Sequence, residues 1–171
     1  GTPIGNGNFG LDPAGNSGQT VFGFGSRATG NVSFASGFRN TASATASVAM
    51  GNYNYATGDS STAIGKESYA QGASSIAIGF KAHAAGDGSV ALGQENVSWG
   101  STNFTSGYQN IAGDITAARG TGGSAVAMGK YNQATADASM ALNRATKATN
   151  QGATSMGLGT TADNVGMLAI G

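Results

Sequence analysis

Few side chains of this 171-residue sequence could act in catalysis. There is one histidine and no cysteine, and charged residues make up 9% of the chain. A histidine that serves as a general base needs an orienting partner, and the sequence places no acidic partner beside His83. Without cysteine there is no thiolate nucleophile, thiolate metal site or disulfide. We therefore expect no catalytic residue and no enzymatic activity.

Aspartates recur at similar points of the sequence, at Asp59, Asp87 and Asp137, with Asp114 at a corresponding place. One interpretation is an ion shared between subunits on a symmetry axis. The favoured one is turn formation, because aspartate accepts hydrogen bonds from nearby backbone. The fragment "GDGS" at 86–89 lacks the rest of a calcium-binding nonapeptide repeat. We expect neither a metal site nor a cofactor.

The spacing of these residues follows an internal repeat, visible in 60–100, "SSTAIGKESYAQGASSIAIGFKAHAAGDGSVALGQENVSWG". A marker glycine ends each "S-x-A-x-G" unit. We place the markers at Gly25, Gly37, Gly51, Gly65, Gly79, Gly93, Gly107, Gly129, Asn143, Gly159 and Gly171. Most steps are 14 residues, with exceptions of 12, 22, 16 and a final 12. A fixed period of this length, with 30 glycines in the chain, predicts a solenoid.

Within a repeat, side chains alternate as in a strand. In "SVAMG", Ser47, Ala49 and Gly51 share one side, while Val48 and Met50 share the other. A second short strand ends near the alanine five residues after each marker. The sequence thus predicts an all-β, flat parallel β-roll of about 11 coils over 21–171. Residues 1–20 are expected to form an irregular N-terminal cap, and the long step indicates an insertion near 114–123.

The two sides of the first strand are given different roles. The large side chains are predicted to fill the roll; they are Val48, Met50, Ile64, Ile76, Ile78, Val90 and Leu92. The opposite side carries only small residues, whereas a sheet face in water usually carries polar ones. We interpret this small-residue side as a subunit interface rather than an exposed face. Its members include Ala49, Ala63, Ala77 and Ala91.

The outward side of the second strand is free to vary and is the candidate binding face. Its members are Tyr53, Tyr55, Tyr69, Lys81, His83 and Tyr131. Tyrosines offer large contact area at low entropic cost, although they are also good strand formers. The same spacing predicts that Lys81 lies between Glu67 and Glu95 on successive coils.

The units "SSIAIGFKAHAAG" and "GSVALGQENVSWG" resemble the head repeats of Yersinia adhesin A type trimeric autotransporter adhesins. The resemblance covers about 21–171 and implies a left-handed β-roll assembled as a homotrimer. It also implies display on the bacterial cell surface from the outer membrane, a part in virulence, and binding to host matrix proteins, surfaces or other cells. Three features depart from the family pattern: the absent neck sequence, Asn143 at a marker position, and the insertion.

Composition excludes some partners and leaves alternatives. The formal net charge is zero, so we expect no nucleic acid partner. No apolar stretch approaches a membrane span, so direct membrane contact by this segment is not expected. A left-handed β-helix acyltransferase is disfavoured because its period is six residues. A trimeric phage tail fibre or receptor-binding segment remains the alternative, and an ice-binding solenoid is less favoured because the threonines are scattered.

Overall fold

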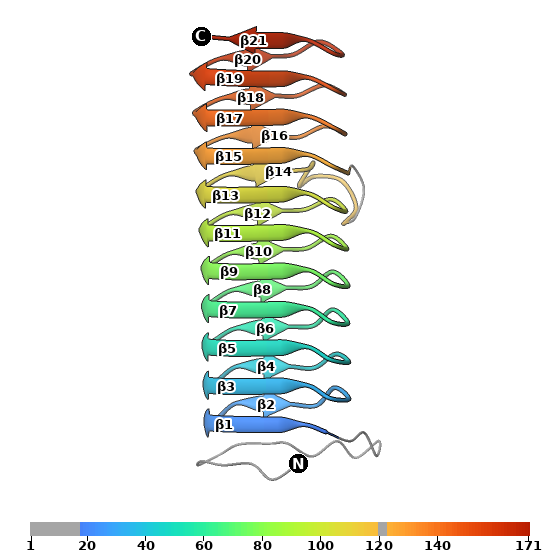
Figure 1. The fold of residues 1–171 in the computed structure, drawn as a ribbon, viewed down its shortest axis with the longest axis vertical. Coiled ribbons are helices and arrows are strands. Elements are labelled where there is room, and N and C mark those ends of the chain that lie inside the picture. The colour runs from blue at the N-terminus through green and yellow to red at the C-terminus, as the bar shows by residue number, and fades with distance from the viewer. Residues whose placement is uncertain (1–17, 120–122) are drawn as a thin grey trace.

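The computed structural model describes residues 18–119 and 123–171 as a tall stack of β-coils (Figure 1). In these described residues, two parallel sheets run the length of the stack. The eleven strands of sheet A are β1 (Thr20–Phe24), β3 (Phe34–Phe38), β5 (Val48–Asn52), β7 (Thr62–Lys66), β9 (Ile76–Phe80), β11 (Val90–Gln94), β13 (Phe104–Tyr108), β15 (Val126–Lys130), β17 (Met140–Arg144), β19 (Thr154–Leu158) and β21 (Leu168–Ile170). The ten shorter strands of sheet B are β2 (Arg27–Ala28), β4 (Thr41–Ala42), β6 (Tyr55–Ala56), β8 (Tyr69–Ala70), β10 (His83–Ala84), β12 (Val97–Ser98), β14 (Ile111–Ala112), β16 (Gln133–Ala134), β18 (Lys147–Ala148) and β20 (Thr161–Ala162). The predicted all-β solenoid of about eleven coils is confirmed.

Strand pairing keeps equivalent residues of successive coils side by side. At the stack centre Gly79 pairs with Gly93, but at the ends two predicted markers are wrong. Gly23 pairs with Gly37, and Asn143 pairs with Gly157, so the markers are Gly23 and Gly157 rather than Gly25 and Gly159. Gly25 and Gly159 lie two residues later, at a corner where φ is +64° and +67°. Glycine is favoured at that left-handed corner too, which explains the misplacement.

The marker position requires glycine for two reasons. At Gly79 φ is +137°, a region that side chains rarely adopt. A Cβ built there would also lie 1.9 Å from the carbonyl oxygen of Gly93 in the next coil. Asn143 is the departure, with φ of +94°; asparagine tolerates positive φ better than most residues.

Buried asparagines fix the corner that follows the marker in several coils; they are Asn40, Asn54, Asn96, Asn110 and Asn132. Asn54 Nδ2 donates to the carbonyl oxygens of Met50 and Gly65, both at 2.7 Å. Its Oδ1 accepts from the backbone N–H of Ser68 in the next coil at 2.9 Å. Such paired amides satisfy buried polar groups while binding one coil to the next.

Alanine fills the interior of the roll. The alanines predicted to form the subunit interface are fully buried within the single chain: Ala49, Ala63, Ala77 and Ala91. They share the interior with the sheet B alanines Ala42, Ala56, Ala70 and Ala84. The predicted alanine interface is therefore wrong, because side chains with 0% exposure have no surface left for a partner. A coil of 14 residues brings its two sheets close together, and only small side chains fit between them.

The predicted core is also wrong, because the alanines and not the large side chains face the interior. Its members are half-buried or exposed on the outer side of sheet A: Val48, Met50, Ile64, Ile76, Ile78, Val90 and Leu92. Met50 and Ile78, for example, are each 38% exposed. The alternation along the strand is as predicted, but its inward and outward sides are reversed. Sheet A consequently presents a largely apolar face to the outside, which is aliphatic on most coils.

The other predicted segments lie partly outside the described residues. This holds for 1–17 of the predicted N-terminal cap and for 120–122 of the predicted insertion. Residues 114–119 lie between β14 and β15 and leave the regular path of the coil. The register across this point is unchanged, because Gly107 pairs with Gly129. Throughout the described chain, no helix is long and apolar enough to cross a membrane.

Candidate binding surface

Aromatic rings line the outer side of sheet B. Tyr55 and Tyr69 stack with centroids 5.0 Å apart and planes inclined by 7°. Tyr69 meets His83 edge-on at 5.9 Å, and His83 meets Trp99 edge-on at 5.8 Å. We call these four residues the aromatic row. Their contacts restrain one another, since stacked and edge-to-face rings are favoured geometries.

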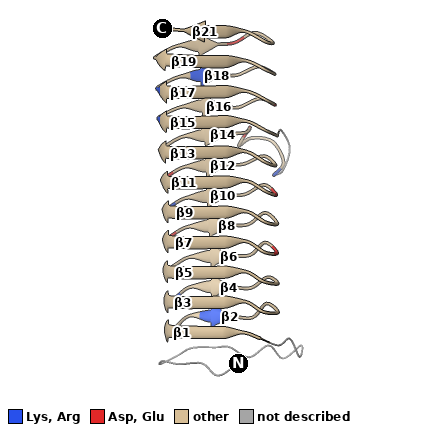
Figure 2. Cartoon of the chain, in the orientation of Figure 1, with Lys and Arg blue, Asp and Glu red and all other residues tan. Residues whose placement is uncertain are grey.

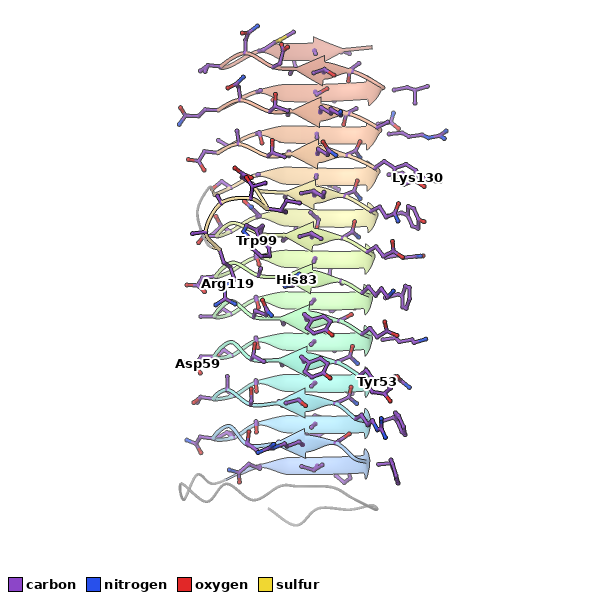
Figure 3. All side chains as sticks on the ribbon, turned by 180° about the vertical axis from the view of Figure 1, so that it is seen from behind. Tyr53, Asp59, His83, Trp99, Arg119 and Lys130 are labelled. Carbon is purple, nitrogen blue, oxygen red and sulfur yellow. The ribbon has the colours of Figure 1, made fainter. Side chains whose placement is uncertain are left out.

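The segment between β14 and β15 folds back onto this row. Trp99 Nε1 donates to the carbonyl oxygen of Ala117 at 3.0 Å. Arg119 Nη1 donates to Gln71 Oε1 at 3.2 Å, and His83 Nε2 lies 3.1 Å from the same oxygen. Figure 3 shows Arg119, His83 and Trp99 close together over sheet B. The inserted segment is thus hydrogen-bonded to two of the coils that precede it.

This packing lowers the pKa of His83. Burial lowers the pKa of its imidazole, and the nearby charge of Arg119 lowers it further. The ring is therefore neutral at physiological pH, as suits a side chain that shares one acceptor oxygen with a guanidinium. Its hydrogen-bond partner is the Gln71 amide, which points to a structural role.

A second row follows the corner after each marker. Glu67, Lys81 and Glu95 occupy equivalent left-handed positions, with φ of +56°, +53° and +54°. Lys81 Nζ lies 3.9 Å from Glu67 Oε2, and Lys66 Nζ lies 3.8 Å from Glu67 Oε1. Glu95 accepts a hydrogen bond from Gln109, which lowers the pKa of its carboxyl. This corner row has the predicted order, with the lysine between two glutamates.

Two of the predicted tyrosines lie on the corner, away from the aromatic row. Tyr53 Oη accepts from Arg39 Nη1 at 2.7 Å. Tyr131 meets the Tyr108 ring at 5.4 Å, and Lys130 Nζ lies 5.0 Å from the Tyr131 centroid. Figure 3 places Tyr53 and Lys130 at one edge and Asp59 at the opposite edge. The six predicted residues therefore form two neighbouring surfaces rather than one.

A groove of about 360 Å³ runs between these two surfaces. Its lining residues are Glu67, Tyr69, Lys81, His83, Glu95 and Val97. Three of the six belong to the corner row and three to the outer side of sheet B. Three of the predicted binding residues, Tyr69, Lys81 and His83, thus meet around one hollow.

A second hollow of about 460 Å³ lies where the inserted segment meets sheet B. Its lining residues are Ile111, Asp114, Ile115, Thr116, Gln133, Thr135, Ala136 and Thr149. Asp114 Oδ1 accepts from the Thr116 backbone N–H at 2.8 Å and from its hydroxyl at 2.6 Å. These bonds lower the pKa of the Asp114 carboxyl and hold the turn. Asp114 is therefore committed to local structure.

The recurring aspartates fasten turns to the coil before them. Asp59 Oδ1 accepts from the Thr45 backbone N–H at 3.1 Å, and Asp87 Oδ1 accepts from that of Ala73 at 2.8 Å. Asp137 accepts from Gly123 in the same way. Turn formation was the favoured interpretation, and the acceptors act between coils rather than within one turn. In the described residues no three metal-binding side chains of the His, Cys, Asp and Glu types gather.

Three contributors to this surface were not predicted: Gln71, Trp99 and Arg119. A signal for Trp99 was present, because it is the single tryptophan and stands six residues after the marker Gly93, where other coils carry small or polar residues. A large indole on the outer surface is expected to pack against another segment, and the inserted segment packs there through the hydrogen bond from Trp99 to Ala117. Arg119 could not be placed, because its position depends on the path of that segment.

Taken together, the fold and its surfaces define a parallel β-solenoid that carries its variable side chains on an outer face. Residues 42–68, 70–96 and 121–142 match the YadA head domain repeat. These matched residues, which make up less than half of the chain, are similar to the repeats of that family, and the resemblance drawn from the sequence is confirmed for them. The family is one of non-enzymatic, adhesin-type head domains displayed at the cell surface. No curated protein matches the sequence.

Proposed function

We propose that this chain is the head of a homotrimeric bacterial adhesin with left-handed coils, displayed from the outer membrane. Its outer surfaces attach the cell to host matrix proteins, abiotic surfaces or other cells. The aliphatic face of sheet A, present on most coils, is the observation that carries this proposal. The family match favours this function over a phage fibre.

The aliphatic face supports association of several copies. Its side chains remain partly exposed in the single chain and recur on nearly every coil. They are Val48, Met50, Ile64, Ile76, Ile78, Val90, Leu92, Val126, Met128, Met140, Leu142 and Met156. Monomeric proteins rarely expose an apolar patch that continues over so many strands. Burying it against two other copies would complete a core that the alanine interior alone is too thin to provide.

The distribution of charge supports burial of the outer side of sheet A. The corner edge carries both cations and glutamates: Arg39, Lys66, Glu67, Lys81, Glu95, Lys130 and Arg144. Aspartates lie at the opposite turns, and Figure 2 shows blue at the arrow tips of β15 and β17 and red at the opposite turns near β7 and β11. In the described strands of sheet A, the first and third residues, which face outward, carry no charge. Charges therefore lie at the edges of this face, as at the polar rim of an interface.

This arrangement leaves sheet B and the inserted segment facing outward. The aromatic row and the corner row are then available to a ligand on each of three sides. Tyrosine and tryptophan contribute large, rigid contact areas at low entropic cost, which suits an adhesive surface. Three copies on one particle would raise the apparent affinity through multivalency.

The proposal is tested in two stages with the intact chain. Light scattering after size exclusion should give three times the chain mass, and a stable monomer would contradict the proposed assembly. Beads coated with the chain should then bind to wells coated with collagens, laminin or fibronectin, or to bare plastic. Failure to bind any of these surfaces would contradict the adhesive function.

A further inference from the structure

The groove between the corner row and the aromatic row has features of a ligand site. Its volume of about 360 Å³ is typical of small-molecule pockets. Its lining comes from three consecutive coils in strict register, with Tyr69 paired to His83 and His83 paired to Val97. The groove therefore offers an ordered array of side chains, repeated at about 4.8 Å along the stack.

The polar wall of the groove carries charges that cancel. Glu67 is flanked by Lys66 and Lys81 at 3.8 and 3.9 Å, and Glu95 is held by Gln109. No net charge remains here to attract an ion of either sign. Carboxylates nevertheless accept several hydrogen bonds each, and an ammonium donates three. Along the stack, the wall offers an acceptor at Glu67, a donor at Lys81 and an acceptor at Glu95. This order suits a ligand whose groups both donate and accept hydrogen bonds.

The floor of the groove is aromatic and held in place. Tyr69 is 38% exposed, so part of its ring is open to a ligand. Its other contacts are the stack on Tyr55 and the edge of His83, and His83 is fixed by Trp99 and Gln71. A ring held in this way loses little freedom on binding. Rings of this kind pack well against the apolar C–H faces of a pyranose.

The sides of the solenoid do not favour an extended peptide. A peptide that adds to a sheet needs an unpaired strand edge. In the described chain both sheets run lengthwise, so their edges lie at the ends of the stack, at β1 and β21 and at β2 and β20. The groove offers no backbone ladder for a peptide to join, only side chains.

From these features we infer that the groove binds a neutral oligosaccharide, with sugar hydroxyls on Glu67, Lys81 and Glu95 and a pyranose face on Tyr69. The inference rests on the proposed adhesive function and gives it a ligand class: the glycans of a host glycoprotein or cell surface. Each copy of the chain carries this groove.

The repeat supplies substitutions that the fold already tolerates elsewhere. Thr41 pairs with Tyr55 in the sheet B row, so threonine is accepted at that level of the coil. Gln109 occupies the corner position of Lys81 and Glu67 in another coil. We therefore choose Tyr69→Thr and Glu67→Gln as groove variants. Tyr131→Gln is the matched control, because Gln109 fills the same corner position in the preceding coil and Tyr131 lies outside the groove lining.

The test uses an array of neutral, sialylated and sulfated oligosaccharides, followed by calorimetric titration of each hit. We expect neutral glycans to bind, with Tyr69→Thr and Glu67→Gln each weakening the affinity about tenfold or more, and Tyr131→Gln changing it less than about twofold. Binding of charged glycans only, no binding at all, or neutral binding that survives both groove variants would overturn the inference.

A second measurement separates this inference from the proposed function. Adhesion of coated beads is compared on a matrix glycoprotein before and after enzymatic removal of its glycans. Loss of adhesion on the deglycosylated surface, and in the groove variants on the intact one, supports glycan recognition. Equal adhesion in every case overturns the glycan inference while leaving the adhesin function standing.

Discussion

The outer rows of sheets A and B differ sharply although the same repeat builds both. On sheet A, nearly every coil presents aliphatic side chains such as Ile64, Ile78 and Leu92. On sheet B the equivalent outer row changes chemistry at almost every step. In order it reads Arg27, Thr41, Tyr55, Tyr69, His83, Val97, Ile111, Gln133, Lys147 and Thr161.

The inner rows of the two sheets do not show this difference. Both are dominated by alanine, with serine and threonine as occasional replacements. Where two replacements meet, as at Ser98 and Thr105, the hydroxyls pair at 2.9 Å. The demands of the coil interior are therefore the same on both sides. Only the outer environment differs: uniform on sheet A, as for a face that meets other copies of itself, and free to vary on sheet B.

The largest expected effect separates the inside of sheet A from its outside. Ala77→Leu places a large side chain in the narrow interior, and we expect it to lower the free energy of unfolding by about 3 kcal/mol or more, or to prevent folding. The matched change one residue later, Ile78→Leu, should cost less than about 1.5 kcal/mol because that side chain lies outside. Denaturant unfolding monitored by circular dichroism measures both. Equal losses in the free energy of unfolding would contradict the assignment of Ala77 to the interior and Ile78 to the outside.

The next prediction contrasts the outer side of sheet A with that of sheet B. The double substitution Ile78→Asp and Leu92→Asp should abolish association, because it would bury two carboxylates per chain in the proposed interface. Val97→Asp, at a similar height on sheet B, should leave the assembly intact. Sedimentation velocity at several concentrations reports the oligomeric state. If only Val97→Asp caused dissociation, the interface between copies would lie on sheet B rather than on sheet A.

A pH titration sharpens the account of sheet B. Burial and Arg119 lower the pKa of His83 below the ordinary value of about 6.5 that applies to the unfolded chain. The unfolded state then binds more protons between these two values, so stability should be full above about pH 6.5 and fall as pH drops through the lowered folded pKa. His83→Gln should remove this part of the pH dependence. Thermal melts from pH 8 to pH 4.5 provide the measurement, and identical profiles for both proteins would contradict it.

The smallest effect tests the corner row. Lys81→Glu places three carboxylates at successive corner positions and should lower the free energy of unfolding by about 0.2–1 kcal/mol. The expected value is toward the lower limit, because the Lys81 side chain is 52% exposed and water screens the pair. The loss should shrink in 1 M salt. Lys81→Gln is the neutral control. A loss that does not respond to salt would point to packing rather than charge.

The sequence predicted the period, the parallel coils and the alignment of equivalent residues, because these follow from spacing alone. Glu67 and Lys81 meet as counted for that reason. It did not reveal which side of the strand faces inward. Alternation separates two sides but does not label them, and aliphatic residues such as Ile78 are normally assigned to a core.

A clue to the inward side was nevertheless present. Alanine recurs in both strands of each coil, as at Ala77 and Ala84, so two small-residue rows were available to face each other across a thin interior. The site was less predictable than the fold. Tyr69, Lys81 and His83 were placed on the outer surface because they share the outward register, whereas the place of Arg119 depends on a segment that follows no repeat.

Because the register is unbroken from β1 to β21, the length of the molecule is proportional to its number of coils. Each coil adds 14 residues and one strand spacing of about 4.8 Å, so the eleven described coils measure roughly 48 Å from first to last. Extra residues between β14 and β15 leave that length untouched, since they leave the stack sideways before Val126 rejoins the register opposite Phe104. Duplication or deletion of one 14-residue unit would therefore change the reach of the head in equal steps while its cross-section stays constant. Reach and surface chemistry can thus vary independently in this protein.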